Sequence, residues 1–436
     1  MKSVKEQALV HRFLDTVCRQ IRARELHMEI KEELTAHLEE QVDNHIANGV
    51  PEKEALELAI ANMGEPKRIG KGLNKAHRPR TDWVMLLLIV LLSAGGILAM
   101  YSINSSESNP MNAANLFEQK IALTVIGFVV MGLLWALDYR KIKKYSEILF
   151  ALGIGFLMFG PSESNTMNGT SAWIPMGPLT LHIPTVAILL LMIGMAGIKP
   201  SRTWSWQVSL FQHIYRGLLP LILLAKMNTL IFGAVYLAIF IIQMWMIRRS
   251  LLQLTILGTG SLVLIGIFAA RAKERMMGFL WPWNDPHGAG YMLLRARDAM
   301  QAGGWWGQGL GATNRTLPFI YNEGMFPYFI YCFGWIAGIA VLIIIFSFIW
   351  KAMVTTSGLK EDYGKRLSAA IGTLFAIQFI WSVMMIFGYA PFVGLTLPFL
   401  SYGGTSVVFP YALIGILLGI YRRRDMIPTG WSTKPI

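Results

Sequence analysis

From residue 83 onward the chain consists of long apolar runs with few charges inside them. A helix needs about 20 mostly apolar residues to cross the roughly 30 Å hydrocarbon core of a bilayer. Seven clear runs lie at 83–102, 121–137, 230–247, 251–270, 328–350, 367–387 and 406–421. Three weaker or shorter runs lie at 145–160, 184–198 and 218–225. The pattern predicts an all-α, polytopic membrane protein of about ten transmembrane helices.

The first 64 residues follow a different pattern, in which apolar positions recur at helical spacing. One stripe repeats every four residues and comprises Leu26, Ile30, Leu34, Leu38, Val42 and Ile46. It predicts a helix of about 23 residues with acidic outer faces. A shorter helix is expected before it, and a third between Pro51 and Gly64. We therefore expect a small three-helix domain at 1–64, followed by a basic linker at 65–82 that suits anionic lipid headgroups.

Charge separates the same two parts of the chain. Of the 436 residues, 54% are apolar and 15% are charged, whereas soluble domains carry about 25% charged residues. Residues 1–82 hold 14 Lys/Arg and 14 Asp/Glu, so the net charge of +13 belongs to the apolar part. The composition therefore argues against a large soluble core.

The basic residues also predict an orientation in the membrane. Clusters of Lys and Arg lie at 140–144, 199–202, 248–249, 351–366 and 422–424. With ten spans, all of them fall on the side of the N-terminus, and cytoplasmic loops carry the excess of basic residues. We expect a multi-pass protein of the bacterial cytoplasmic membrane with both termini cytoplasmic. The membrane domain is then 83–425, the cytoplasmic tail 426–436, and the largest outward loop 271–327.

Polar residues concentrate in two segments of the predicted outward side. The loop 271–327 is rich in arginine, which runs against the orientation bias and favours an anionic ligand such as a pyrophosphate. A solvated charged loop is the alternative. The many glycines and tryptophans of the loop 271–327 favour a structured re-entrant or interfacial loop over a solvated one. The segment 394–406 combines Gly and Pro at membrane depth, which is tolerated where protein or water surrounds it, and so predicts a cavity lining.

Several separated motifs resemble, in the same order, those of the SEDS family (shape, elongation, division and sporulation) of bacterial cell-wall proteins. The main ones lie at 394–406 (Gly-Leu-Thr-Leu-Pro-Phe-Leu-Ser-Tyr-Gly-Gly-Thr-Ser), 285–291 and 303–311. Shorter matches lie at 117–120, 138–140, 168–169 and 173–174. This resemblance covers residues 83–425. Residues 13–79 resemble instead the permease-prefix helical domain that precedes several bacterial membrane proteins, which implies regulation or partner docking.

The resemblance implies a peptidoglycan glycosyltransferase that polymerises lipid II, a disaccharide-pentapeptide on undecaprenyl pyrophosphate, at the outer membrane face during cell-shape maintenance or division. It also implies membrane lipids and a class B penicillin-binding-type transpeptidase as partners, and no nucleic acid. The substrate-binding residues expected from the motifs and the arginine surplus are Lys120, Trp173, Arg275, Asp285, Arg295, Arg297, Ser401, Gly403 and Gly404. Of these, we expect Lys120 and the three arginines to contact the pyrophosphate or headgroup.

Glu323 takes the place of the aspartate that the family uses as its catalytic residue. That aspartate lies five residues after a Leu-Pro and eleven before a glycine, and both Leu317-Pro318 and Gly334 count to Glu323. The carboxylate is expected to accept the proton of the acceptor hydroxyl. Other family positions also differ, since Lys226 replaces an acid and His182 begins a segment that differs from the family's Gln-Pro-Ser-Glu.

These departures leave two further functions open. One is a non-catalytic lipid II-binding or scaffold protein of the wall machinery, and the other is a flippase for lipid-linked precursors. A carrier should have charged residues near the middle of its spans, and few appear there in the sequence. The sequence predicts no metal site and no certain cofactor, and a bound divalent cation stays open.

Overall fold

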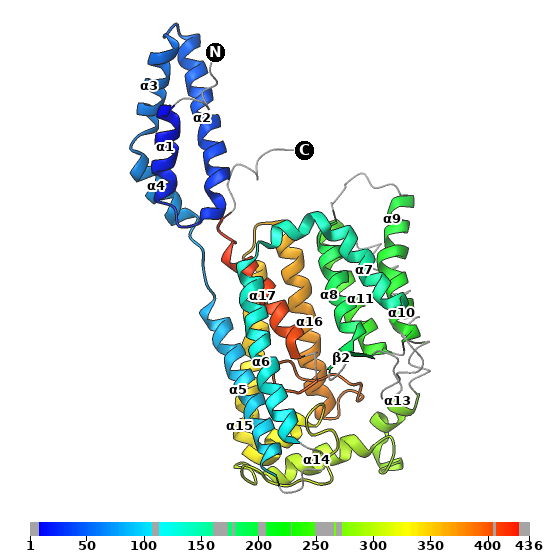
Figure 1. Ribbon diagram of the computed structural model, residues 1–436. Coiled ribbons are helices and arrows are strands. Elements are labelled where there is room, and N and C mark those ends of the chain that lie inside the picture. Colours follow the sequence, from blue (N-terminus) through cyan, green and yellow to red (C-terminus); the bar gives the residue numbers. More distant parts are fainter. Residues whose placement is uncertain are drawn as a thin grey trace. The chain divides into compact units, whose positions relative to one another are not determined.

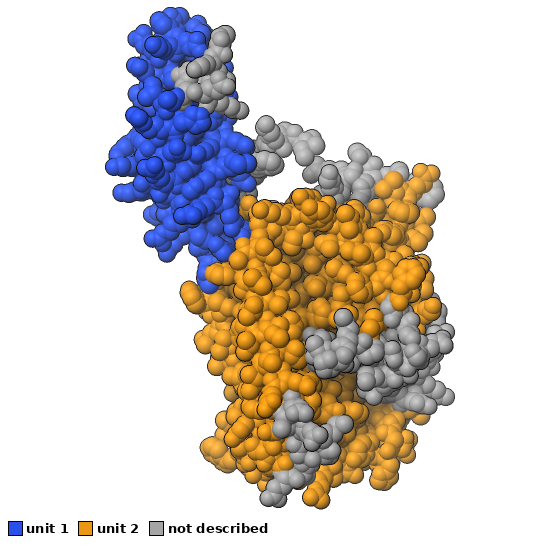
Figure 2. All heavy atoms as spheres, in the orientation of Figure 1, with its two compact units in different colours: residues 1–81, 421–436 blue, residues 82–420 orange. Residues whose placement is uncertain are grey.

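The structure, a computed structural model, describes residues 8–106, 113–159, 173–176, 179–198, 206–227, 229–248, 266, 273–403 and 407–426. It is helical apart from one two-stranded sheet among these residues (Figure 1). Contacts divide the chain into two compact units, which are coloured in Figure 2. The first comprises residues 1–81 with 421–436, and the second comprises residues 82–420.

Among the described residues, the first unit has four helices, one more than the three expected within 1–64. They are α1 (Ala8–Arg19), α2 (His27–Ala47), α3 (Glu52–Met63) and α4 (Pro66–Ala76), with a short turn η2 (Arg24–Leu26) between α1 and α2. The segment predicted as a linker thus contains α4. Proline at the first turn favours its start, Ile69 and Leu73 pack on the apolar core of the unit, and Gly70 allows close approach to α1 at Val17.

The predicted stripe on α2 is largely correct. Ile30, Leu38 and Val42 are buried in the core of the first unit, and Leu34 packs partly against it. Ile46, in the last turn of the helix, is exposed. Helical spacing therefore identifies the buried face of α2 except at its C-terminal turn.

Long apolar helices dominate the second unit. Among the described residues, four are long and apolar enough to cross a membrane, namely α5 (Trp83–Asn104), α6 (Ala113–Ala136), α15 (Met325–Ser357) and α16 (Asp362–Ile386). The shorter α17 (Val408–Arg422) packs closely against α6, since a Cβ on Gly415 would lie 2.6 Å from Met131 O. Asp82 caps α5 by accepting from Met85 N at 3.1 Å and pairs with Lys351 Nζ at 3.1 Å.

The remaining apolar runs form helices of irregular length. They are α7 (Ser146–Phe159), α8 (Ile183–Ala196), α9 (Trp206–His213), α10 (Leu219–Lys226) and α11 (Leu230–Arg248), with the hairpin of β1 (Trp173–Met176) and β2 (Leu179–His182) before α8. A π-helical turn η5 (Ile214–Leu218) joins α9 to α10, so the weak run at 218–225 is the end of a longer helical stretch.

Nine of the ten predicted runs each coincide with a helix among the described residues, which confirms the polytopic, all-helical class. The run at 251–270 lies almost wholly outside the described residues. The total of ten spans therefore stays a prediction.

The loops between the spans are partly helical. The loop 271–327 contains α13 (Lys273–Leu280), η6 (Pro282–Asn284) and α14 (Tyr291–Gly303). Figure 1 shows α13 and α14 at the same end of the second unit as the segment that precedes α17. At η3 (Tyr139–Tyr145), Tyr139 donates to Glu361 at 2.8 Å, and burial with this carboxylate raises the pKa of Tyr139 well above its usual range. The hydroxyl thus stays protonated and fastens η3 to α16.

Candidate functional site

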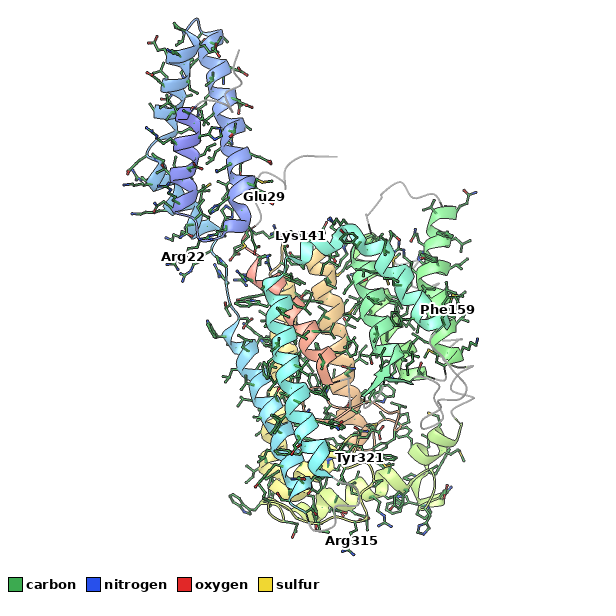
Figure 3. All side chains as sticks on the ribbon, viewed as in Figure 1. Arg22, Glu29, Lys141, Phe159, Arg315 and Tyr321 are labelled. Atoms are coloured by element: carbon green, nitrogen blue, oxygen red, sulfur yellow. The ribbon has the colours of Figure 1, made fainter. Side chains whose placement is uncertain are left out.

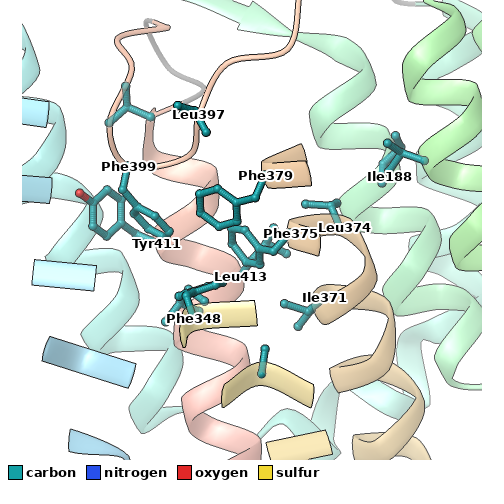
Figure 4. Close-up of a cluster of buried hydrophobic side chains, with 14 of the residues drawn as sticks. Ile188, Phe348, Ile371, Leu374, Phe375, Phe379, Leu397, Phe399, Tyr411 and Leu413 are labelled. Carbon is teal, nitrogen blue, oxygen red and sulfur yellow. The ribbon is translucent and has the colours of Figure 1, made fainter. Parts of the chain in front are cut away.

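The segment 394–403 reaches α17 through an unusual backbone. Gly394 and Phe399 both adopt positive φ, at +65° and +67°. For a residue with a Cβ this conformation costs roughly 1–2 kcal/mol, and such strain persists only where the surroundings impose it. The Phe399 ring supplies that constraint, since it stacks on Phe375 at 5.9 Å and meets the Tyr411 ring edge-on at 5.0 Å (Figure 4).

Lys120 fixes the same segment from the side of α6. Its ammonium is fully buried and donates to the carbonyls of Phe399 at 2.9 Å and Ser401 at 2.8 Å. Next to it, Gln119 Oε1 accepts from the Tyr402 hydroxyl at 2.6 Å. The carbonyls of a non-helical segment need hydrogen-bond donors where water is excluded. Lys120 is the donor for two of these carbonyls. This geometry makes Lys120 a support for the segment, and the headgroup contact expected of it stays a prediction.

Glu323 lies on a tight turn that is joined to this segment. Asn322 N and Gly324 N both donate to Phe319 O, at 2.9 and 3.0 Å, and Phe319 itself has a φ of +49°. Ser401 Oγ donates to Asn322 O at 3.0 Å, and the carbonyl of Tyr321, labelled in Figure 3, accepts from the Tyr402 amide at 2.8 Å.

The carboxylate of Glu323 faces Gly394. A Cβ on that glycine would lie 3.5 Å from Glu323 Oε1, and the Glu323 side chain is half-buried. Three of the sequence-predicted site residues, Lys120, Glu323 and Ser401, are thus brought together around one segment. Three separate parts of the chain meet here: α6, the turn before α15 and the segment 394–403 before α17.

The glycine-rich loop 303–311 fills a break in α15. Gly334 has φ +79° and ψ 174° inside this helix, which interrupts its hydrogen bonds. The loop satisfies the freed groups, since Trp335 N donates to Gly304 O at 2.9 Å and Gln308 N donates to Tyr331 O at 2.8 Å. A Cβ on Gly334 would collide with Trp305 O. The glycines of this motif therefore permit close backbone contact.

The arginines of α14 lie on different faces. Arg295 pairs with Asp298 at 3.2 Å and lies over the Tyr291 ring at 5.3 Å, whereas Arg297 is solvent-exposed. The Arg295 Nε is buried without a hydrogen-bond partner in the described part of the chain. Because Asp298 and Tyr291 hold the Arg295 guanidinium while its side chain stays 32% exposed, Arg295 is better placed than Arg297 to meet a ligand from a fixed position.

Asp285 has a structural contact in its own loop. Its two carboxylate oxygens accept from Gly288 N and Ala289 N, both at 2.9 Å. It also borders a cavity of about 560 Å³, whose other lining residues are Gly278, Phe279, Gly288, Ala289, Met292, Leu293, Ala390 and Phe392. The lining is largely apolar, and Phe392 is only two residues from Gly394, so the cavity lies beside the segment that faces Glu323.

Three predicted site residues lie wholly or partly outside the described residues. Gly404 and the side chains of Trp173 and Arg275 lie outside what the structure describes, and for Trp173 the backbone pairing with His182 in the hairpin is described. Gly403 follows Tyr402 at the end of the described segment. Within the described ranges, no group of three His, Cys, Asp or Glu side chains converges as metal ligands.

Two polar contacts inside the helices were missed from the sequence. Gln119 lies beside Lys120 in the motif 117–120, but adjacent helix positions point about 100° apart, so helical spacing did not indicate its contact with Tyr402. Arg216 in η5 is 3% exposed and its Nη2 donates to both Glu147 oxygens, at 2.5 and 2.6 Å. It lies just before the predicted run 218–225 and pairs with the first turn of α7, so it does not bear on the expectation of few charges near the middle of the spans. Its bidentate pairing satisfies the buried charge locally.

The fold and site together define a polytopic helical membrane protein in which the turn that carries Glu323 is hydrogen-bonded to the non-helical segment before α17. The sequence profile of the FtsW, RodA and SpoVE family, described as cell cycle proteins, matches residues 82–426. The chain therefore belongs to this family.

Similar proteins agree with this assignment. A probable peptidoglycan glycosyltransferase FtsW of Thioalkalivibrio sp. (strain K90mix) is 27% identical over 82% of this chain and 94% of that protein. The stage V sporulation protein E of Bacillus subtilis (strain 168) is 24% identical over 78% of this chain and 97% of that protein.

Solved structures share the fold. A chain from a peptidoglycan synthase complex, described for its coordination of polymerization and crosslinking, matches with a TM-score of 0.63 and 20% identity over 79% of this chain and 98% of that chain. The rod shape determining protein RodA of Thermus thermophilus matches with a TM-score of 0.55 and 17% identity over 79% of this chain and 97% of that chain.

Proposed function

We propose that the protein is a peptidoglycan glycosyltransferase that polymerises lipid II at the outer face of the cytoplasmic membrane, with Glu323 as its general base. The observation that carries the proposal is the junction of Glu323 with the segment 394–403. This junction unites two motifs of a family in which relatives bear the name peptidoglycan glycosyltransferase.

In the proposed reaction, the 4-hydroxyl oxygen of the acceptor sugar forms a bond to the anomeric carbon of the donor. The bond from that carbon to the pyrophosphate oxygen breaks, and undecaprenyl pyrophosphate leaves with the electron pair. Glu323 accepts the proton of the attacking hydroxyl, which makes the oxygen more nucleophilic. A fixed carboxylate suits this role, and the strained turn at Phe319 with its bond to Ser401 fixes the backbone of Glu323.

The leaving pyrophosphate needs positive charge nearby. Arg295 is our first candidate, because its guanidinium is held in place by Asp298 and Tyr291 and its side chain is still 32% exposed. Arg275 and Arg297 are further candidates from the same loop. The cavity beside Asp285 and Phe392 is mostly apolar, so we assign it to an uncharged part of the substrate rather than to the pyrophosphate.

Glu323 differs from the aspartate of the family by one methylene. We take the residues around position 323 to be arranged for the longer glutamate side chain. An aspartate at this position would then hold its carboxylate about 1 Å from where it meets the acceptor hydroxyl, and a displacement of that size costs of order a hundredfold in rate. The Glu323→Asp variant should therefore be slow rather than improved.

A membrane-anchored transpeptidase of the penicillin-binding type is the proposed partner. The support is the similarity to a chain from a complex that coordinates polymerization and crosslinking. The long helices carry exposed apolar residues, among them Ile343 and Phe346 on α15. In the membrane, these residues are available to contact lipid or the partner protein.

The test is polymerisation of labelled lipid II by the purified protein, alone and with candidate transpeptidases. Glu323→Ala is compared with wild type and with Glu118→Gln, a solvent-exposed acid on α6 that serves as matched control. We expect glycan strands from wild type and from the control, and at least about a hundredfold less from Glu323→Ala. Lipid II binding without strands in any reaction would contradict the proposal and favour the scaffold function.

A further inference from the structure

Residues 311–324, which we call the Glu323 arm, join the glycine-rich loop to α15 through turns and bends, without a helix or strand. Asn314 stabilises one bend of the arm, because its Oδ1 accepts from the amides of Thr316 and Leu317, both at 3.1 Å. A segment of this kind lacks the regular backbone hydrogen bonds of a helix or strand. Its position therefore depends on contacts made by side chains.

Two tyrosines in the first two turns of α15 reach back and close the arm into a loop. Tyr328 Oη donates to Ala312 O at 3.1 Å, and Tyr331 Oη donates to Thr313 O at 3.2 Å. The tyrosines are three positions apart, so helical spacing places them on one face of α15, and their ring centroids are 6.4 Å apart. The chain thus leaves this point, passes through Glu323 and returns to it, as in an Ω-loop.

Further hydroxyl groups hold the arm from other elements. Tyr291, at the start of α14, donates to Thr316 O at 3.0 Å. The amide of Gly311 donates at 2.9 Å to Ser102 Oγ, which is fully buried on α5. The far end of the arm is joined to the segment 394–403, as described above. Side chains of three helices, α5, α14 and α15, therefore fix the part of the arm that precedes the turn.

A tyrosine suits this purpose because its ring is rigid and its hydroxyl is a donor at the end of a long side chain. Joining the two ends of an irregular loop removes backbone freedom that the loop would otherwise have. A general base needs this order, because a displacement of about 1 Å can cost of order a hundredfold in rate. Holding both ends of the arm therefore keeps the Glu323 carboxylate opposite Gly394.

We propose that Tyr328 and Tyr331 are positioning residues for Glu323. Their hydroxyls hold the arm closed, and the closed arm keeps the carboxylate facing the segment 394–403. Both tyrosines act through Glu323 rather than on the reacting atoms. The effect on the rate rests on the proposed function, whereas the closure of the arm does not.

The closure is tested by hydrogen–deuterium exchange of the full-length protein in lipid nanodiscs. Tyr328→Phe and Tyr331→Phe each remove one hydroxyl and keep the ring. We expect the amides of 312–323 to exchange at least about threefold faster in each variant. Tyr101→Phe, at a 45% exposed tyrosine of α5, is the matched control and should not change this exchange.

Tyr331 is only half-buried, whereas Tyr328 is buried, so Tyr331→Phe keeps the test decisive if Tyr328→Phe folds poorly. Exchange in 312–323 that stays at the wild-type rate in Tyr331→Phe would overturn the closure of the arm by this residue. The same result in both variants would overturn the proposal as a whole.

The role in catalysis is tested by the steady-state kinetics of lipid II polymerisation. We expect kcat to fall by about tenfold or more in each tyrosine variant while KM stays within about twofold, because the base is displaced and the binding contacts remain. Tyr101→Phe should keep both values. Faster exchange in the arm with an unchanged kcat would overturn the positioning role.

A second background separates positioning from a general structural effect. When Glu323→Gln is already present, neither tyrosine variant should lower the residual rate further, because a positioning residue acts only through the carboxylate. A further loss as large as in wild type would overturn the proposal. If wild type forms no strands at all, the proposed function fails and the positioning of a base falls with it, and exchange alone decides the closure of the arm.

Discussion

Lys120 donates a hydrogen bond from a fully buried ammonium to the carbonyl of Phe399, a residue that holds a left-handed backbone. The two residues are 279 positions apart in the sequence, and their contact shapes the segment that faces Glu323. The side chain of Lys120 thus acts on the backbone of the site, which explains why a cation is retained inside an apolar helix.

Replacing Lys120 with methionine should collapse this support. Two carbonyls would lose their donor, and each buried acceptor left unpaired costs about 1–3 kcal/mol. We expect a lower thermal unfolding midpoint in detergent together with loss of polymerisation. Lys226→Met, at an exposed lysine of α10, is the matched control and should change neither. Normal stability and activity of Lys120→Met would show that the segment holds its conformation by other contacts.

Gly334 should be intolerant of any side chain. Its φ of +79° disfavours other residues, and a Cβ there would collide with the carbonyl of Trp305. Gly334→Ala should therefore detach the loop 303–311 from α15, lowering the free energy of unfolding by about 2–4 kcal/mol. Gly372→Ala, in α16, meets open space and should be neutral. Thermal unfolding and limited proteolysis within 303–311 provide the measurement, and equal behaviour of the two variants would refute the assigned role.

Arg295 should contribute to substrate affinity more than to stability. Arg295→Gln removes the charge while keeping a polar side chain, so we expect lipid II binding to weaken by about tenfold, or roughly 1.4 kcal/mol. Arg315→Gln is the control, because Arg315 is solvent-exposed in the same loop (Figure 3). Binding is measured by fluorescence of labelled lipid II. Equal loss in both variants would indicate a general effect of loop charge rather than a specific contact.

The hydrophobicity pattern was sufficient for the class of fold and for most helices, because bilayer thickness and helical rise dictate the length of an apolar run. It underestimated the helical stretch that ends in 218–225, since Arg216 interrupts the apolar character just before that run, whereas Glu147 pairs with the arginine in the fold. It also took the segment of α4 for a linker. In that helix the basic residues dominate the composition, and only Ile69 and Leu73 reveal the buried side.

For the site, the sequence identified residues that come together but not what each contacts. Glu323 and Ser401 were expected to belong to one site, and the structure places their segments in direct contact. The sequence did not indicate that the carboxylate of Asp285 accepts from the amides of its own loop while the residue also borders the cavity near Phe392. Such differences depend on backbone geometry, for example the positive φ of Phe399, which follows from tertiary packing and leaves no mark in residue type.

The central claim, that Glu323 is the general base, is tested most directly by Glu323→Gln. Glutamine keeps the size and polarity of the side chain but has no carboxylate to accept a proton. Lipid II binding and strand formation are measured on the same preparation of the purified protein. We predict binding within about threefold of wild type and a rate of strand formation at least about a hundredfold lower. Strand formation at the wild-type rate by Glu323→Gln would contradict the account.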